Sequence, residues 1–211
     1  MAERVSTKGN PHLQRVYAST SVDETRESYD EWAATYDHDM LDQEYVAPAL
    51  VAAEVARRVD LSGQFLDAGC GSGAVGIELA KLGAKAIDGV DLSPGMLGIA
   101  RKAGAYRNLE TADLSKRLRF DENSYDALVC CGTLTQGHVG PQALSEFVRV
   151  IKPDGVVVAT VLDNIWASGG YEREVQRLDS EGLVHVESTD AHPYRRSANV
   201  FARVVTLRKR A

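Results

Sequence analysis

The sequence predicts one α/β domain built on a mostly parallel, doubly wound sheet with helices on both faces. Three observations lead to this fold class. Short apolar runs alternate with helical patterns from residue 63 onward, a glycine-rich turn at 67–73 follows the first run, and the last two runs are only a short link apart. Such alternation is typical of βαβ units, whose crossover helices cover both sides of a sheet.

The composition is that of an ordinary globular domain with a sizeable core. Of the 211 residues, 44% are hydrophobic and 26% are charged. The 30 acidic residues outnumber the 24 basic ones, which gives a net charge of -6. An acidic chain is poorly suited to phosphate backbones, and no apolar run approaches the ~20 residues of a membrane span. We expect a small-molecule substrate, no nucleic acid and no membrane, and the oligomeric state stays open.

The three cysteines, Cys70, Cys130 and Cys131, indicate neither a disulfide framework nor a metal site. Their number is odd, two are adjacent, and no Cys or His pair has the spacing of metal ligands. Residues 1–10 are polar and lack the apolar core of a signal peptide. We therefore expect no metal and a reducing, cytoplasmic compartment.

The chain divides into three segments. Residues 1–21 are polar without clear periodicity, so we expect a mobile N-terminal arm. Residues 22–62 carry two helical patterns, at about 23–39 and about 45–59, and are expected to form N-terminal helices that act as a lid. Residues 63–211 form the main α/β domain.

In the main domain, apolar spacing and turn residues place each element. Ser93 caps a helix that Pro94 begins, and Pro153 stops another. The expected strands cover residues 65–68, 86–91, 109–112, 125–131, 156–162, 183–188 and 200–207. The expected helices cover residues 74–82, 94–102, 142–151 and 171–181. About 11 residues link the last two strands, which is too few for a parallel crossover, so the last strand should run antiparallel.

The segment from Phe65 to Gly73 has the pattern of a strand, a glycine turn and the start of a helix. Glycines let the backbone approach a ligand, and the free N–H groups of the next helix add a positive end. Asp91 follows about 20 residues later, at the tip of the second strand, where a carboxylate can accept both hydroxyls of a ribose. This combination indicates an adenosine-containing ligand.

The glycine turn by itself leaves three readings open. From Gly71 onward it also matches the GxGxxG pattern of dinucleotide-binding oxidoreductases, and it could be a purely structural turn. Asp67 would repel a pyrophosphate, but it could attract the ammonium group or the sulfonium of a methyl donor. A turn that began at Gly71 would also leave Asp67 and Gly69 inside a strand, where both fit poorly. These features favour a methyl donor over a dinucleotide.

The run LDAGCGSG, together with Asp91, resembles the class I S-adenosylmethionine-dependent methyltransferases. The resemblance covers Gln64 to about Leu207. It implies a Rossmann-like, seven-stranded sheet in the order 3-2-1-4-5-7-6 with strand 7 antiparallel, and S-adenosylmethionine as the cofactor. The runs YDEWAATYD, YVAP and GTLTQGHVGPQALSEFVRVIKPDG are similar to the Williams–Beuren-region methyltransferase-like proteins. This second similarity implies no particular substrate.

The resemblance implies a role for each residue around the glycine turn. Asp67 should contact the methionine ammonium group through water, and the backbone at Gly69 and Gly71 should line the methionine and ribose. Asp91 should bind the ribose hydroxyls, with Leu92 beside the adenine.

Further along the chain, the resemblance implies four more cofactor contacts. Asp113 should accept a hydrogen bond from the adenine amino group, with Ala112 and Leu114 on either side of it. Cys131, at the end of the fourth strand, should offer its carbonyl near the methionine amine.

Tyr29, Trp32 and Tyr36 share one face of the first expected helix, because they are spaced i, i+3, i+7. Tyr29 and Tyr36 match a YDxxAxxYD pattern that, by the resemblance, covers the cofactor. The rings could form a lid over the sulfonium, which aromatic faces attract, or could simply anchor the helix by burial. Both readings stay open.

The acceptor side should be built from loops at the same edge of the sheet as the glycine turn. In an open α/β sheet, ligands bind beyond the carboxyl ends of the parallel strands. The loops after the fourth and fifth strands, and the link between the last two, should therefore meet there. The residues that we expect to line a substrate pocket are Trp32, Thr133, Asn164, Trp166 and Tyr194.

Two histidines in these loops, His138 and His192, are candidates for catalysis. Either could act as a general base near neutral pH, or could form a polar wall of the pocket. The residues after the fourth strand, CGTL, lack the Asn/Asp-Pro-Pro-aromatic run of the family's amino-group methylators. This difference disfavours methylation of adenine or of glutamine side chains.

The reaction implied is an in-line displacement, in which an O, N, S or C nucleophile of a small organic acceptor attacks the sulfonium methyl group. A sulfonium is already activated, so the protein contributes mainly positioning and desolvation. The alternatives are a protein acceptor, a protein of this fold that binds the cofactor without transferring methyl, and an NAD-dependent oxidoreductase.

Overall fold

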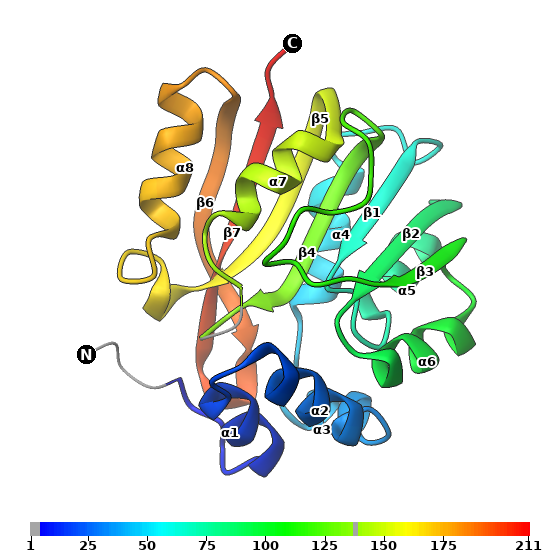
Figure 1. Cartoon of the computed structure of the whole chain (residues 1–211), viewed down its shortest axis with the longest axis vertical. Helices are drawn as coiled ribbons and strands as arrows, with labels where there is room; N and C mark the ends of the chain where they lie inside the picture. The colour runs from blue at the N-terminus through cyan, green and yellow to red at the C-terminus, as the bar shows by residue number, and fades with distance from the viewer. Residues whose placement is uncertain (1–4, 137–138) are drawn as a thin grey trace.

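A seven-stranded sheet forms the centre of the molecule (Figure 1), and its strand order is β3-β2-β1-β4-β5-β7-β6. The structure is a computed structural model and describes residues 5–136 and 139–211. β7 pairs antiparallel with both β5 and β6, while the other pairs are parallel, so the predicted topology is confirmed. The strands are β1 Gln64–Ala68, β2 Ala86–Asp91, β3 Asn108–Thr111, β4 Tyr125–Leu134, β5 Ile151–Leu162, β6 Val184–Arg195 and β7 Val200–Lys209.

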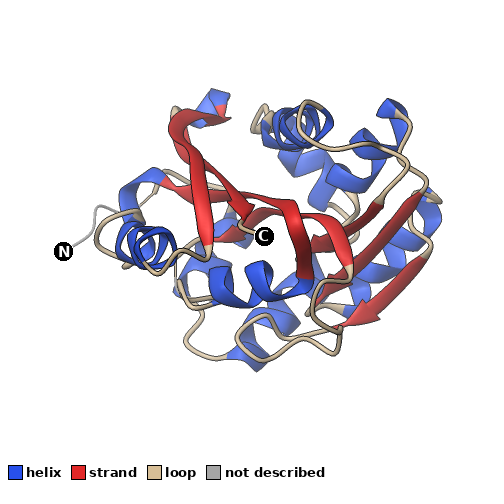
Figure 2. Cartoon of the chain, turned by 90° about the horizontal axis from the view of Figure 1, so that it is seen from above, coloured by secondary structure: helices blue, strands red, loops and turns tan. Residues whose placement is uncertain are grey.

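Helices pack on both faces of the twisted sheet (Figure 2) and enclose two apolar layers. One layer joins the sheet to α4 and α5 through residues such as Val51 and Leu79. The other joins it to α7 and α8 through residues such as Phe147 and Leu178. These helices are α4 Ala47–Ala56, α5 Ala74–Leu82, α6 Pro94–Ala103, α7 Ala143–Val150 and α8 Tyr171–Ser180.

The expected arm over residues 1–21 contains a helix that the sequence analysis did not predict, α1 Pro11–Ala18. Asn10 caps the helix by accepting from the Leu13 amide at 2.9 Å. Leu13 and Val16 are buried against Trp32 and Met40. The helix was missed because only these two apolar side chains mark its buried face, and the packing comes from residues distant in sequence.

The single helix expected at about 23–39 is two helices, α2 Val22–Trp32 and α3 Tyr36–Asp42. The amide of Thr35 donates to the carbonyl of Trp32 at 3.0 Å, which closes a turn between them. The indole Nε1 of Trp32 also donates to Asp39 at 2.6 Å, so the side chain spans the break. Figure 1 shows α1, α2 and α3 grouped together below one edge of the sheet.

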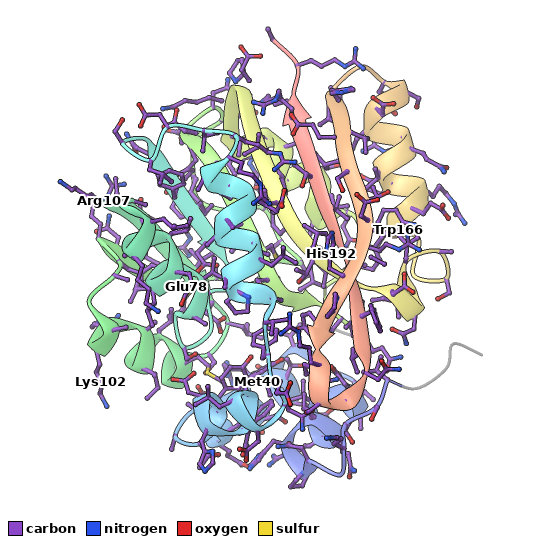
Figure 3. The ribbon with its side chains drawn as sticks, turned by 180° about the vertical axis from the view of Figure 1, so that it is seen from behind. Met40, Glu78, Lys102, Arg107, Trp166 and His192 are labelled. Atoms are coloured by element: carbon purple, nitrogen blue, oxygen red, sulfur yellow. The ribbon has the colours of Figure 1, made fainter. Side chains whose placement is uncertain are left out.

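The link expected at residues 189–199 is mostly strand, because β6 continues to Arg195 and pairs with β7 over this length. Only a short 3-10 turn, Arg196–Ala198, and Asn199 connect the two strands. The hairpin extends to the N-terminal helices (Figures 1 and 3), where Arg195 forms an antiparallel bridge with Tyr45. β4 likewise continues beyond its expected end at residue 131 to Leu134.

Candidate functional site

The glycine turn after β1 adopts a backbone that only glycine tolerates easily. Gly69, Gly71 and Gly73 have φ values of +78°, +54° and +101°. A Cβ atom at Gly69 would collide with the Thr133 side chain, whereas a Cβ at Gly71 would meet nothing within 4 Å. Gly71 borders a cavity, so the turn brings backbone to its edge and leaves the space beside it open.

Asp91 ties the end of β2 to this turn. One carboxylate oxygen accepts from the Gly71 amide at 2.8 Å, and the other accepts from the Ser93 amide at 2.9 Å. Burial raises the pKa of Asp91 above its ordinary value, although these two hydrogen bonds oppose the rise. Each oxygen retains a lone pair for a ligand hydroxyl, so the side chain suits a ribose diol.

The cavity beside the turn has a volume of about 260 Å³ and lies between the sheet edge and the N-terminal helices. Every residue expected to contact the cofactor lines it except Asp67. The predicted residues that line it are Tyr29, Tyr36, Gly69, Gly71, Asp91, Leu92, Ala112, Asp113, Leu114 and Cys131.

Asp67 lies behind the glycine turn and does not line the cavity; it is only 1% exposed. Its Oδ2 accepts from the Tyr106 hydroxyl at 2.7 Å, while Oδ1 has no hydrogen-bond partner among the described residues. Burial raises the pKa of Asp67 to about 7, and the bond from Tyr106 opposes part of that rise. Contact with a ligand ammonium group through water stays a prediction.

Tyr106 is a supporting residue that the sequence analysis missed. Its hydroxyl donates to Asp67 and accepts from the Gly76 amide at 3.1 Å. Cβ atoms at Gly76 and Gly89 would each overlap its ring. The two glycines were a usable signal, because glycine inside a helix or a strand often marks the close approach of another group.

Asp113 is a second carboxylate in the wall of the cavity. Its Oδ1 accepts from the Ser115 amide at 2.9 Å and from the Ser115 hydroxyl at 2.6 Å, and Lys116 lies 3.1 Å from Oδ2. Burial by itself would raise the pKa of Asp113, but these partners lower it below the ordinary value. The carboxylate is therefore charged at neutral pH and can accept from an amino group.

The aromatic face of the lid divides between the two roles that the sequence left open. Tyr29 and Tyr36 line the cavity. Trp32 does not line the cavity, so its assignment to the substrate pocket is wrong. The side chain is only 1% exposed. Its ring stacks on that of His12, with ring centres 5.4 Å apart, and packs edge-on against Tyr36. Trp32 anchors the lid because the ring is buried among other rings.

Sequence reasoning also missed several lining residues of the N-terminal segment. They lie just before and within α2 and around the start of α4, and they carried no motif. These residues are Thr20, Ser21, Val22, Thr25, Tyr45 and Pro48.

A polar corner forms where β4 ends near the lid. The Tyr45 hydroxyl lies 3.1 Å from the Cys131 sulfur. A Cβ at Gly132 would lie 2.7 Å from the Tyr45 hydroxyl and 3.1 Å from that of Tyr194. Burial raises the pKa of Cys131 to about 12, so its thiol is neutral and is not a nucleophile at physiological pH.

The acceptor-side expectations are met only in part. Thr133 lines the cavity, but Tyr194, Asn164 and Trp166 do not. Tyr194 lies one layer behind the wall, in edge contact with Tyr45, and Trp166 is packed in the core. Loop residues after a strand can turn either into the core or toward the ligand edge, and apolar burial decided this for Trp166.

Of the two candidate histidines, the structure describes only His192. His192 lies within β6 rather than in a loop, and Figure 3 shows it along the strand, away from the N-terminal helices. It does not line the cavity, so its catalytic assignment is not supported. His138 lies outside the described residues.

Over residues 5–136 and 139–211, no group of three or more His, Cys, Asp or Glu side chains could hold a metal ion.

A methyltransferase domain family matches residues 66–159, the stretch from β1 to β5 that carries the glycine turn, Asp91 and Asp113. The human Methyltransferase-like protein 27 is 34% identical over 162 residues, which cover 74% of this chain and 66% of that protein. The chain belongs to the class I S-adenosylmethionine-dependent methyltransferases. S-adenosylmethionine is the cofactor of this family.

Other relatives of this methyltransferase domain agree with the assignment. Demethylmenaquinone methyltransferase of Chlorobaculum tepidum is 34% identical over 111 residues, which cover 50% of this chain and 45% of that protein. Magnesium protoporphyrin IX methyltransferase of Synechocystis has the same fold, and its structure was solved with bound S-adenosylmethionine. The comparison of the two structures gives a TM-score of 0.62 at 20% sequence identity and covers 96% of this chain and 92% of the Synechocystis chain. The chain spans about two thirds or less of the length of these curated relatives.

The residues present fit this cofactor. Gly71 leaves open space at the edge of the cavity, and both oxygens of Asp91 retain acceptor capacity.

Among the described residues, no helix is long and apolar enough to cross a membrane.

Proposed function

We propose that the chain catalyses methyl transfer from S-adenosylmethionine to a small organic acceptor. One observation carries this proposal: a single cavity has in its wall the carboxylates Asp91 and Asp113, which we assign to adenosine, and the phenol groups of Tyr29, Tyr36 and Tyr45. Space beyond an adenosine site, walled by neutral polar groups, is what an acceptor requires.

The side chains divide the work of binding and positioning. Asp91 takes the ribose and Asp113 the adenine amino group, which leaves the methionine portion toward Cys131 and Tyr45. The bound cofactor supplies an activated methyl group. Tyr29 and Tyr36 cover this region and exclude water, and aromatic faces attract a nearby cation. Positioning of this kind is the main contribution that such a transfer needs from a protein.

Among the described residues, those that line the cavity beside Cys131 offer no strong general base. Burial raises the pKa of the Tyr36 and Tyr45 hydroxyls well above their ordinary value and keeps the Cys131 thiol neutral. This arrangement supports an acceptor atom that is nucleophilic without help from the enzyme. The Chlorobaculum relative, named for demethylmenaquinone, supports a small-molecule acceptor in the same family.

The test has a binding step and a transfer step. In the binding step, calorimetry measures the affinity of the chain for S-adenosylmethionine, S-adenosylhomocysteine and NAD. We expect the first two to bind and NAD to bind at least tenfold more weakly. Preferential binding of NAD would overturn the proposal. Labelled S-adenosylmethionine is then incubated with a panel of phenols, carboxylic acids, amines and thiols. Cofactor binding without transfer to any panel member would favour a protein that only binds the cofactor.

A further inference from the structure

Arg195, the last residue of β6, is a buried cation that has no anionic partner among residues 5–136 and 139–211. It is 1% exposed. Nη1 donates to the Gln43 side chain at 3.2 Å, and Nη2 donates to the Ser6 carbonyl at 2.9 Å and to the Tyr17 hydroxyl at 3.4 Å. Nε has no hydrogen-bond partner in the described part of the chain.

This arrangement differs from that of the other well-covered arginines. Arg58 is paired with Glu54 and Glu187, and Arg149 is paired with Glu146. No carboxylate of the described residues forms an ion pair with Arg195. A buried guanidinium normally requires an anion as well as hydrogen bonds, because neutral acceptors only partly replace its hydration.

The unsatisfied side of Arg195 has the shape that a carboxylate recognises. Nε and Nη2 lie on one edge of the guanidinium, and together they form the two-pronged donor for side-on binding of a carboxylate. On this edge Nε is free and Nη2 holds only a peptide carbonyl and a distant hydroxyl. The Ser6 carbonyl thus occupies one of the two positions that carboxylate oxygens would take.

Arg195 is not a lining residue of the cavity, but it lies next to residues that are. Its backbone forms a β-bridge with that of Tyr45, which lines the cavity, and its charge opposes the rise in the pKa of Tyr29, another lining residue. The two neutral partners on its open edge, Ser6 and Tyr17, both come from the segment 5–18. This segment covers Arg195 and leads directly into the lining residues Thr20 to Val22.

We propose that Arg195 binds a carboxylate group of the methyl acceptor, which takes the place of the Ser6 carbonyl on the Nε–Nη2 edge. The proposal rests on the proposed methyl transfer and adds the chemical class of the acceptor: an organic acid. One guanidinium whose hydrogen-bond partners are all neutral matches a single negative charge, which a carboxylate supplies.

The experiment uses the full chain saturated with S-adenosylhomocysteine. Calorimetry measures three matched pairs of probes: 4-hydroxybenzoate and 4-hydroxybenzamide, 3-phenylpropionate and its amide, and hexanoate and its amide. We expect at least one acid to bind roughly tenfold more tightly than its amide, because a charge-assisted pair is worth more than a neutral hydrogen bond. Arg195→Gln should bring that ratio to about one, and Arg195→Lys should retain part of it.

The exposed neighbour Arg196 provides the matched control, since Arg196→Gln removes the same charge without touching the site. Two results would overturn the proposal: no preference for any acid in the wild-type chain, or a preference that survives in Arg195→Gln. If Arg195→Gln does not fold, the wild-type ratio and its reduction in Arg195→Lys decide instead. Affinity for S-adenosylhomocysteine is measured separately without acids, so a failure of the cofactor site is distinguished from a failure of acid recognition.

Discussion

The hydroxyl group of Ser93 donates a 2.5 Å hydrogen bond to the carboxylate of Asp30, across 63 positions of the sequence. The same oxygen of Asp30 accepts from the Gly95 amide at 2.8 Å. A carboxylate is favourable there because the first N–H groups of α6 have no partner within the helix. Helix α2 is thereby attached to the start of α6, two residues after Asp91.

Loss of this attachment should loosen the lid over the cofactor. We expect Asp30→Ala to weaken binding of S-adenosylhomocysteine roughly tenfold, because hydrogen bonds to a charged group contribute about 1.5–3 kcal/mol. Calorimetry gives the affinity, and hydrogen exchange should show faster exchange across α2. Glu27→Ala, an exposed change on the same helix, is the control. Unchanged affinity in Asp30→Ala would show that the attachment does not serve binding.

Asp91 should contribute directly to cofactor affinity. Asp91→Asn keeps the size of the side chain but removes the charge and one acceptor oxygen, so we expect binding of S-adenosylhomocysteine to weaken by roughly tenfold or more. Glu110→Gln, on the exposed strand β3, removes one negative charge elsewhere and should have little effect. Equal affinities of the Asp91 variant and the wild-type chain would contradict the ribose assignment.

Asp67 should make stability depend on pH. Burial raises its pKa from 3.8 to about 7. Between these values the folded chain holds a proton that the unfolded chain has lost, so the free energy of unfolding should fall as pH rises, by up to about 1.4 kcal/mol per pH unit.

The isosteric variant Asp67→Asn isolates this contribution. It cannot ionise, so its free energy of unfolding should fall less steeply between about pH 4 and pH 7 than that of the wild-type chain. Urea unfolding without cofactor measures both curves. Parallel curves over this range would mean that Asp67 does not titrate as described.

Gly76 should be intolerant of a side chain because of Tyr106. A Cβ at Gly76 would overlap the Tyr106 ring, which donates to Asp67, so we expect Gly76→Ala to destabilise the fold by about 1–3 kcal/mol. The matched change Gly98→Ala, in the open part of α6, should be neutral or stabilise the helix by up to about 1 kcal/mol. Thermal or urea unfolding compares the two, and equal effects would contradict the packing argument.

Local sequence patterns were sufficient for the elements of the main domain. The helix at 74–82 and the strand at 86–91 have their predicted bounds, because turn glycines and an apolar run mark both ends. The short link before β7 was enough to predict an antiparallel strand, although the hairpin is longer than expected. The glycine turn and Asp91 were likewise recognised from local features and lie at one cavity, whereas the other expected cofactor residues at that cavity were assigned through the family resemblance.

Residues whose role depends on a partner distant in sequence were beyond such patterns. The helix at 11–18 is stabilised by burial against Trp32, and the break between α2 and α3 is spanned by the bond from Trp32 to Asp39. Trp166 packs into the core, where nothing in its local sequence placed it.

The alternation of strands and helices, the antiparallel last strand and an adenosine-type glycine turn thus follow from local patterns along the chain, and the resemblance that the motifs carry supplied the family, the sheet order and the cofactor. The wall of the acceptor end, the support of Asp67 by Tyr106 and the burial of Arg195 follow only from tertiary packing. The physical reason is that desolvation and charge pairing depend on which distant groups surround a side chain.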